Sequence, residues 1–244
     1  MLLAVDIGNT TTGFAVMHKT GRIVSVAVID TDANEGKIRA VVGKILKGQA
    51  VSKAVICSVV PKASKALEDI VKKNIPVKII GRDIIVPIKN AYKNPKQVGQ
   101  DRLVGAYGAM KIYGRPLIVV DLGTAITFDV VSAKGQYLGG IIVPGIRLSA
   151  ESLFLKTALL PHIEIKPPKQ IIGKTTQESI LSGLFYGYGS LCRGLIDMIG
   201  RQMKQKPRVV MTGGHTRLMK KFVSPKIRII DEDLVFKGIY FLSN

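Results

Sequence analysis

Two short segments combine a carboxylate, a glycine and a hydroxyl at the same spacing. They read Asp6-Ile7-Gly8-Asn9-Thr10 and Asp121-Leu122-Gly123-Thr124. A glycine lets the chain turn tightly, so that backbone N–H groups and nearby hydroxyls are free to hold phosphate oxygens. The carboxylate can bind Mg²⁺ or its water shell, because hard cations take oxygen ligands. An ordinary hairpin turn also favours Asp, Gly and Asn, and the first segment alone would fit that reading equally well.

The presence of two such segments favours phosphate binding, since two loops on facing lobes can hold a polyphosphate from both sides. No Gly-x-x-x-x-Gly-Lys-Ser/Thr segment occurs in the chain, which excludes the P-loop solution to nucleotide binding. Around the first loop we expect phosphate contacts from Asp6, Ile7, Gly8, Asn9, Thr10, Thr11, Thr12 and Gly13.

An acid and an arginine stand side by side at Asp101 and Arg102. Phosphoryl transfer needs a base that orients and finally deprotonates the attacking hydroxyl, together with positive charge on the phosphates. Asp101 could be this base, and Arg102 could bind a phosphate or a carboxylate in bidentate fashion. A surface ion pair without function is the commoner explanation of such a dipeptide. Only the surrounding motifs give the pair a catalytic meaning.

The hydrophobic pattern predicts the elements that must position these segments. In the first half it predicts strands at 1–5, 13–16, 23–29, 54–60 and 77–81 and helices at 35–46 and 62–73. In the second half it predicts strands at 117–120, 126–130, 137–143, 208–211 and 227–230 and helices at 147–156, 176–203, 216–222 and from 233 onward. Strands that alternate with helices indicate an α/β fold.

The second half repeats the opening of the first. When Asp6 is placed on Asp121, an offset of 115 residues, strand falls on strand and turn on turn. This indicates a duplication. We therefore expect two similar lobes, an N-terminal lobe at 1–115 and a C-terminal lobe at 116–244.

The composition is that of a folded protein without a membrane anchor. Hydrophobic residues make up 47% of the 244 residues, yet the apolar runs fall far short of the roughly 20 residues that a membrane span needs. No secretory leader pattern follows Met1, so we expect a cytoplasmic protein. Cys57 and Cys192 lie far apart in apolar surroundings, which favours two buried thiols over a disulfide or a metal site.

The formal charge of +19 raises the question of a nucleic-acid partner. The two halves are about equally basic, and neither a basic tail nor a known nucleic-acid-binding motif accompanies the charge. We expect a lysine-rich solvated surface that favours anionic substrates, and no nucleic-acid partner. His18, His162 and His215 are scattered and lack the spacing of metal ligands.

Taken together, the motifs resemble those of the superfamily of sugar kinases, heat-shock protein 70 and actin. Within it, nearly the whole chain resembles the type III pantothenate kinases. Besides the two opening segments, the resemblance rests on Gly99-Gln100-Asp101-Arg102, Ala125-Ile126-Thr127-Phe128-Asp129, Gly139-Gly140-Ile141-Ile142-Val143-Pro144-Gly145 and Thr212-Gly213-Gly214. Gln100 departs from the family pattern, which has a small residue such as Ala there. The resemblance implies duplicated ribonuclease-H-like lobes that face each other across an ATP cleft.

It further implies ATP-dependent phosphorylation of pantothenate to 4′-phosphopantothenate, the first step of coenzyme A biosynthesis, by direct in-line transfer in a homodimer. Asp101 would be the general base, Thr124 would contact ATP, and Asp6 would bind Mg²⁺. The substrate contacts implied are Tyr92, Gly99, Gln100, Asp101, Arg102 and Thr176. Asp121 would hold a monovalent cation, K⁺ or NH₄⁺, although the residues alone would assign it to Mg²⁺.

Some assignments stay open at this stage. Tyr92 could equally be a loop tyrosine in ordinary packing, and Thr175 has capping-box spacing to Glu178, which leaves Thr176 as the substrate threonine. Five glycines between 183 and 200 indicate close helix packing, so contacts between subunits are expected there. The alternatives to a pantothenate kinase are a nucleic-acid-binding accessory regulator, which would not need Asp101, and a kinase of the same fold for another small alcohol.

Overall fold

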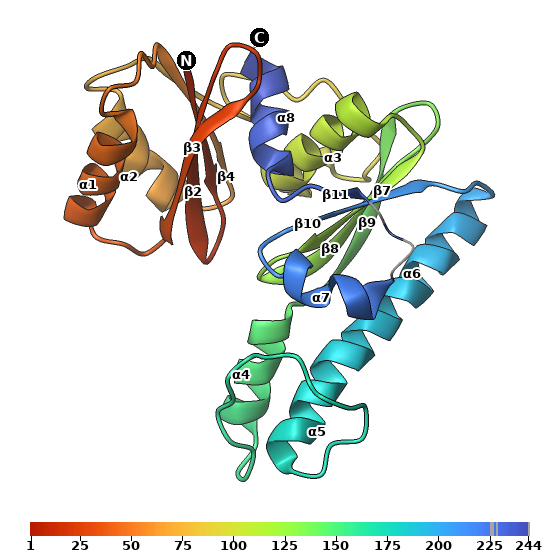
Figure 1. Cartoon of the computed structure of the whole chain (residues 1–244). Coiled ribbons are helices and arrows are strands. Elements are labelled where there is room, and N and C mark those ends of the chain that lie inside the picture. The colour runs from red at the N-terminus through yellow and green to blue at the C-terminus, as the bar shows by residue number, and fades with distance from the viewer. Residues whose placement is uncertain (225–226, 228, 244) are drawn as a thin grey trace. The chain divides into compact units, whose positions relative to one another are not determined.

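The structure is a computed structural model that describes residues 1–224, 227 and 229–243 (Figure 1). The chain divides into two compact units: unit 1 comprises Met1–Ile112 and Asp233–Asn244, and unit 2 comprises Tyr113–Glu232. The predicted boundary at residue 115 lies close to the junction after residue 112. The predicted lobe 116–244 was wrong in one respect, because the C-terminal helix belongs to unit 1.

Unit 1 is built on a sheet with the strand order β3-β2-β1-β4-β5. The first three strands form an antiparallel meander, and β4 and β5 continue it in parallel with β1. The strands are β1 (Leu2–Ile7), β2 (Thr11–Met17), β3 (Ile23–Asp30), β4 (Lys53–Ser58) and β5 (Val77–Ile79). A short strand, β6 (Lys89–Asn90), and a 3₁₀ turn, η1 (Pro95–Gln97), follow.

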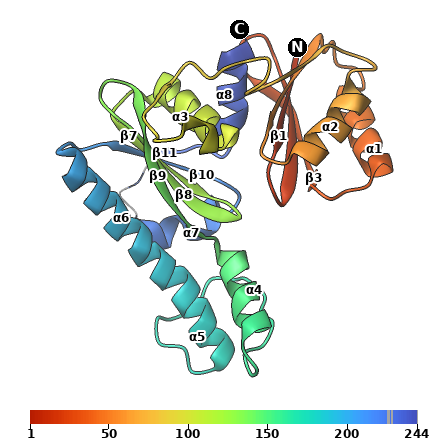
Figure 2. The ribbon, with the colours of Figure 1, turned by 180° about the vertical axis from the view of Figure 1, so that it is seen from behind.

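The helices of unit 1 cover both faces of this sheet. Those that contact the sheet are α1 (Glu35–Leu46), α2 (Pro61–Val71) and α8 (Leu234–Ser243), whereas α3 (Gln100–Tyr113), whose last residue begins unit 2, packs on α8. Figures 1 and 2 show α1 and α2 on one side of the sheet and α8 on the other. Local chemistry starts these helices: the Asn34 side chain accepts from the Lys37 N–H before α1, and Pro61 opens α2. Helix α8 belongs to unit 1 because it packs on β1 and β4.

Unit 2 repeats this sheet in the order β11-β10-β7-β8-β9. Its strands are β7 (Leu117–Leu122), β8 (Ala125–Val131), β9 (Gln136–Pro144), β10 (Arg208–Thr212) and β11 (Ile229–Ile230). Strand β7 lies 115 residues after β1, and the order and directions of the strands match those of unit 1. The predicted duplication is therefore confirmed as two α/β lobes of one topology.

The helices of unit 2 are α4 (Ile146–Lys156), α5 (Thr176–Ser182), a π-helical turn η2 (Gly183–Gly187), α6 (Tyr188–Met203) and α7 (Thr216–Val223). The predicted helix 176–203 thus exists as one rod interrupted by η2. Both views show α4 beside α5, and the pair extends away from the sheet (Figures 1 and 2). Ser149 of α4 and Tyr188 of α6 are joined by a hydrogen bond of 2.5 Å between their hydroxyls.

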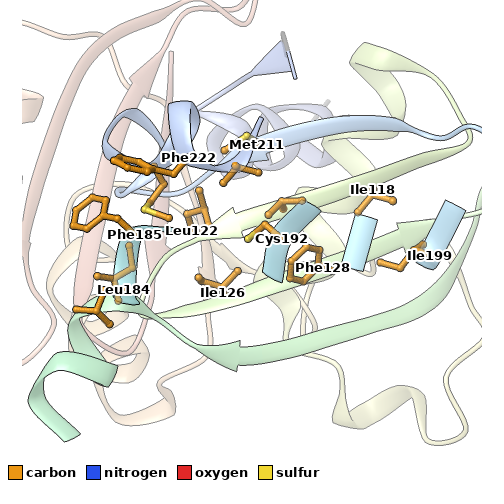
Figure 3. Close-up of a cluster of buried hydrophobic side chains, with 14 of the residues drawn as sticks. Ile118, Leu122, Ile126, Phe128, Leu184, Phe185, Cys192, Ile199, Met211 and Phe222 are labelled. Atoms are coloured by element: carbon orange, nitrogen blue, oxygen red, sulfur yellow. The ribbon is translucent and has the colours of Figure 1, made fainter. Parts of the chain in front are cut away.

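The core of unit 2 attaches the long helix to the sheet (Figure 3). Buried side chains of β7 and β8, such as Ile118, Leu122 and Phe128, pack against Phe185 and Cys192 of the helical rod. Phe185 and Phe222 lie with their ring centroids 5.0 Å apart. Both cysteines, Cys57 and Cys192, are buried free thiols, as expected from the sequence.

Two further differences concern secondary structure. Helix α3 was not predicted, because Leu103, Val104, Ala106 and Ala109 are all buried and the helix lacks the polar stripe that reveals an amphipathic helix. The predicted strand 227–230 is present at Ile229–Ile230, and residue 228 lies outside the described residues. Over the part of the chain that the structure describes, no helix combines the length and apolar character needed to cross a membrane.

Candidate active site

The first Asp-x-Gly loop connects β1 to β2. The turn closes with a hydrogen bond of 3.0 Å from the Gly8 N–H to the Thr11 carbonyl. Thr31, just after β3, anchors it from the side: its hydroxyl donates to the Gly8 carbonyl at 2.7 Å and lies 3.1 Å from the Thr12 hydroxyl. This leaves Asn9, Thr10 and Thr11 on the exposed rim of the turn.

The remaining residues predicted for this loop have other surroundings. Ile7 is 1% exposed, so only its backbone could meet a ligand, and the buried Thr12 hydroxyl lies against Thr31. A Cβ at Gly13 would approach the Phe236 ring of α8 to 2.9 Å, so packing alone requires a glycine there. The structure therefore offers Gly8 to Thr11 as the ligand-facing part of the loop.

Asp101 stands in the first turn of α3. Its Oδ1 accepts a hydrogen bond of 2.8 Å from the Arg102 backbone N–H. Burial raises the pKa of the Asp101 carboxyl above its usual value, while this N–H and the Arg102 charge act in the opposite direction. An aspartate whose pKa is raised in this way is suited to accept a proton during catalysis.

Gly99 is explained by its closeness to this acid. A Cβ at position 99 would overlap Asp101 Oδ1 and lie 3.3 Å from Val59 Cγ1. Any side chain there would displace the carboxylate, so Gly99 keeps space for it. We assign Gly99 to the positioning of Asp101, and a direct substrate contact remains a prediction.

Gln100 lies against a glycine turn on the other side. The turn after β5 contains Gly81 at φ +89°, and a Cβ there would come within 2.9 Å of the Gln100 side chain. The missing Cβ of Gly81 gives the longer Gln100 side chain its room. The departure from a small residue at position 100 is thus accommodated by local packing and does not displace Asp101.

The Cys57 thiol is influenced by the charges of both Asp6 and Asp101. Cys57 lies directly opposite Asp6 in the β1–β4 ladder and is fully buried. Burial raises the pKa of this thiol strongly, and the negative charges of Asp6 and Asp101 raise it further. Both carboxylates therefore raise the pKa of the same buried thiol, which lies near the carboxyl ends of β1 and β4. Unit 1 thus brings the predicted base and the predicted phosphate loop together.

Tyr92 is half-buried in the segment between β6 and η1. Asn90 holds this segment, since its side-chain oxygen accepts from the Tyr92 N–H at 3.0 Å and its amide donates to the Pro95 carbonyl at 3.3 Å. Asn94 caps η1 by accepting from the Lys96 N–H. This role of Asn90 could not be predicted from the sequence, because a lone asparagine in a loop has many possible partners.

The second Asp-x-Gly loop connects β7 to β8 and is enclosed by two other glycine turns. A Cβ at Gly213, which has φ +92°, would overlap Asp121 Oδ1 and lie 2.7 Å from the Leu122 backbone nitrogen. The Gly145 N–H donates to the Thr124 carbonyl at 3.0 Å, and a Cβ there would overlap that oxygen. The three glycine motifs of unit 2 therefore form one backbone cradle around Asp121 and Thr124.

His215 closes this cradle. Its backbone N–H donates to the Leu122 carbonyl at 3.0 Å. Burial lowers the pKa of the His215 imidazole, the Arg147 charge lowers it further, and the backbone of Gly123 and Leu122 acts in the opposite direction. The lowered pKa favours the neutral form of the His215 imidazole beside the loop.

The capping of α5 separates the two candidate threonines. The Thr175 hydroxyl accepts from the Glu178 N–H at 3.2 Å, and the Glu178 carboxylate accepts from the Lys174 N–H at 2.8 Å. Thr175 is therefore engaged as the helix cap, whereas Thr176 is exposed. Thr176 begins α5, which both views show beside α4 and away from the sheet of unit 2 (Figures 1 and 2).

The residues of the two Asp-x-Gly loops fit Mg²⁺ and a monovalent cation, the ions predicted for phosphoryl transfer. Among the described residues no group of three or more His, Cys, Asp or Glu could hold a metal. Each loop offers one carboxylate, which suits Mg²⁺, because this ion commonly keeps its waters and binds one or two carboxylates together with substrate phosphates. Asp121 Oδ1 lies against Gly213, the Gly123 and Thr124 carbonyl oxygens lie against Gly145, and oxygen donors of both kinds also suit a monovalent cation.

Two lobes of one topology, each with an Asp-x-Gly loop between its first two strands, define the class of two-lobed phosphotransferases and ATPases that includes the sugar kinases. The fold is similar to that of a glucokinase from Streptomyces griseus solved with glucose and AMPPNP, with a TM-score of 0.56, 13% identity and coverage of 99% of this chain and 98% of that one. It is also similar to a Campylobacter jejuni protein described as a Baf family transcriptional activator, with a TM-score of 0.64, 19% identity and coverage of 98% and 96%. At these identities the likeness shows the fold alone.

Sequence comparison gives the family. Residues 2–198 match the type III pantothenate kinase family, and the chain is 44% identical to the type III pantothenate kinase of Persephonella marina over 98% of its own length and 97% of that protein. The chain belongs to the type III pantothenate kinase family.

Proposed function

We propose that this protein transfers the γ-phosphate of ATP to the primary hydroxyl of pantothenate and forms 4′-phosphopantothenate, the opening step of coenzyme A biosynthesis in the cytoplasm. One observation carries the proposal. In a member of this kinase family, Asp101 is held by the Arg102 N–H, has space reserved by Gly99, and has its pKa raised by burial.

The chemistry assigned to unit 1 follows from these positions. Asp101 accepts the proton of the attacking hydroxyl, and Arg102 supplies fixed positive charge for a phosphate or for the pantothenate carboxylate. The N–H groups and hydroxyls of the Gly8–Thr11 turn bind phosphate oxygens, and Asp6 binds the Mg²⁺ that accompanies ATP. Tyr92 packs on the pantothenate body. Transfer is direct, so no covalent enzyme intermediate forms.

In unit 2, Thr124 contacts ATP and Asp121 holds K⁺ or NH₄⁺. The packing of Gly213 against the Asp121 carboxylate supports this assignment, because it holds in place a negative charge that a monovalent cation can bind while it offsets the charge of the phosphates. Replacement of K⁺ by Na⁺ should therefore lower turnover. Initial rates measured in matched chloride salts test this, and equal rates in both salts would remove the cation role of Asp121.

We also propose a homodimer formed through the α4–α5 part of unit 2. Large apolar side chains are exposed there: Leu155 is 71%, Leu159 91% and Ile172 76% exposed. An apolar surface of this kind on a globular protein marks a site of interaction. Thr176 begins α5 in the same part of unit 2, so its proposed contact with pantothenate would be made from this face.

The experiment incubates purified protein with ATP, Mg²⁺, K⁺ and a panel of alcohols that contains pantothenate, and detects added phosphate by mass spectrometry. We expect phosphorylation of pantothenate, with Asp101→Asn as the inactive control. Phosphorylation of another alcohol but not of pantothenate would reject the substrate. Absence of any product in K⁺ and in NH₄⁺ would reject the kinase.

A further inference from the structure

A groove in unit 2, which we call the α6–β10 groove, lies away from the Asp121 loop. It runs between the C-terminal half of α6 and the first residues of β10, beside β11 (Figure 1). Arg208 begins β10 and pairs with Leu117 at the start of β7, whereas Asp121 stands near the other end of β7. The groove has a volume of about 1150 Å³. Ligand pockets usually have roughly 300–1,000 Å³, so the groove has room for a small organic molecule.

The floor of the α6–β10 groove is apolar. Ile196 of α6, Val209 of β10 and Ile229 of β11 line it, and each is half-buried. The groove-lining residues of α6 lie on one side of the helix, because they recur at positions 193, 196, 197, 200 and 201. Cys192 and Ile199, on an adjacent side of α6, pack in the core of unit 2. The core thus leaves part of this apolar surface open to the apolar portion of a ligand.

Cations surround this apolar floor. The charged residues that line the groove are all exposed: Arg193, Asp197, Arg201, Lys206 and Arg208. Among the described lining residues, four cations therefore accompany a single acid. In the part of the chain that the structure describes, none of these four cations forms an ion pair, with Asp197 or with any other acid. Their positive charge is available to an anionic ligand.

The backbone holds two of the arginines in place. The Arg193 guanidinium donates to the carbonyls of Phe222 and Val223, the latter at 3.2 Å. The Arg208 guanidinium donates to the Tyr113 carbonyl. Because a guanidinium has five N–H donors, each arginine keeps at least one donor for a ligand while its position is fixed.

Unit 1 has a groove at the equivalent place, between α1 and the end of α2. Its volume is about 460 Å³, less than half that of the α6–β10 groove. Its cations are Lys47 and Arg39, and the Arg39 guanidinium is bonded to the Glu35 carboxylate. The shared topology therefore accounts for a small groove, and the larger volume and the additional cations are particular to unit 2.

We propose that the α6–β10 groove binds a small phosphorylated molecule with an apolar body. The four cations hold the phosphate, and the apolar body lies on the floor formed by Ile196, Val209 and Ile229. Arginine matches the geometry of phosphate oxygens, and a phosphate monoester carries nearly two negative charges at neutral pH, which suits four cations and one acid. No residue of the site takes part in the proposed phosphotransfer, so either proposal can fail without the other.

Calorimetric titration of the whole protein with n-octyl phosphate tests the site. The protein is first saturated with a non-hydrolysable ATP analogue and Mg²⁺, so that phosphate binding at the two Asp-x-Gly loops does not contribute. We expect octyl phosphate to bind more tightly than inorganic phosphate or octanol. Arg201→Ser/Lys206→Ser should weaken its binding by about tenfold or more. Lys44→Ser/Lys134→Ser is the matched control, because it removes the same charge from exposed lysines outside the groove.

A variant that fills the groove tests the apolar floor separately. A Cβ at Gly200 would lie 3.5 Å from the Gln205 carbonyl oxygen and 3.7 Å from Pro207 Cδ, which is ordinary contact. Gly200→Leu should therefore fold and weaken octyl phosphate binding by about tenfold, while Gly200→Ala should bind it like the wild type. Equal effects of the two lysine and arginine double variants, equal binding of octyl phosphate and octanol, unchanged binding by Gly200→Leu, or no binding at all would each overturn the proposal.

Discussion

At the residue scale, three glycines shape the candidate site because they have no Cβ atom. Gly99 leaves room for the Asp101 carboxylate, Gly81 leaves room for Gln100, and Gly213 leaves room for Asp121. A sequence shows a glycine but not the atom that would collide with its Cβ. For this reason the motif Gly99-Gln100-Asp101-Arg102 could be found from the sequence, whereas the reason for its first residue could not.

Asp101→Asn should separate activity from stability. Loss of the base should lower kcat by about 10²- to 10⁴-fold. The raised pKa of Asp101 means that the folded protein binds this proton more tightly than the unfolded chain, so the wild type loses stability as pH rises through the folded pKa. The variant has no such loss. Urea denaturation at acidic and neutral pH should show the stability difference shifting toward the variant with rising pH, and a parallel pH dependence of the two proteins would contradict the burial of this charge.

Gly99→Ala should impair the chemistry without touching a ligand directly. The new Cβ would overlap Asp101 Oδ1, and a displacement of about 1 Å can cost on the order of 10²-fold in rate. The matched control is Gly105→Ala in α3, where an added Cβ meets nothing within 4 Å. Steady-state kinetics should show a fall in kcat for the first variant alone. Similar kcat values for both variants would show that position 99 does not hold the acid in place.

At the scale of the element, helices with an amphipathic pattern and a capping residue could be predicted from the sequence. A helix that is buried on several sides, and so has no amphipathic pattern, could not. Helix α1 matches its predicted range because Asn34 and its apolar spacing mark it. Helix α3 has no polar stripe, since it is buried on several sides. The anchoring of the first Asp-x-Gly loop by Thr31 could not be predicted either, because its bonds to Gly8 and Thr12 join residues that lie about 20 positions apart.

The crossing of α3 and α8 depends on two facing glycines. A Cβ at Gly108 would lie 2.9 Å from the Gly238 Cα, and one at Gly238 would overlap the Val104 carbonyl. Gly238→Ala should therefore destabilise the protein by roughly 1–3 kcal/mol. Gly183→Ala, with open space at its Cβ and helical neighbours, is the control and should not destabilise. Thermal unfolding distinguishes them, and an unchanged Tm for Gly238→Ala would show that the helices can separate freely.

At the scale of the molecule, the duplication was visible in the sequence because the strand pattern and the Asp-x-Gly loops repeat with one offset. The assignment of α8 to unit 1 could not be predicted, since nothing in the sequence of residues 234–243 indicates that they pack on β1 and β4. The exposed apolar face of unit 2 could not be predicted either, because the sequence alone does not distinguish an exposed apolar residue from one in the core.

The α4–α5 face provides the test at this scale. Leu155→Asp together with Leu159→Asp should convert a dimer to a monomer and lower kcat/KM for pantothenate more than for ATP, if the substrate pocket includes this face. Analytical ultracentrifugation measures the first effect and steady-state kinetics the second. A dimeric double variant would contradict the proposed interface.

The packing of α8 in unit 1 determines the order in which the two units of the nascent chain can fold. Helix α3, which carries Asp101, needs Gly238 against it, and Gly238 leaves the ribosome only after the whole of unit 2 has been made. Unit 2 is contiguous and can fold during synthesis, whereas unit 1 must wait with its sheet uncovered on one face. The unit that begins first is thus the last to be completed, and no fragment that stops before residue 233 can contain a complete unit 1.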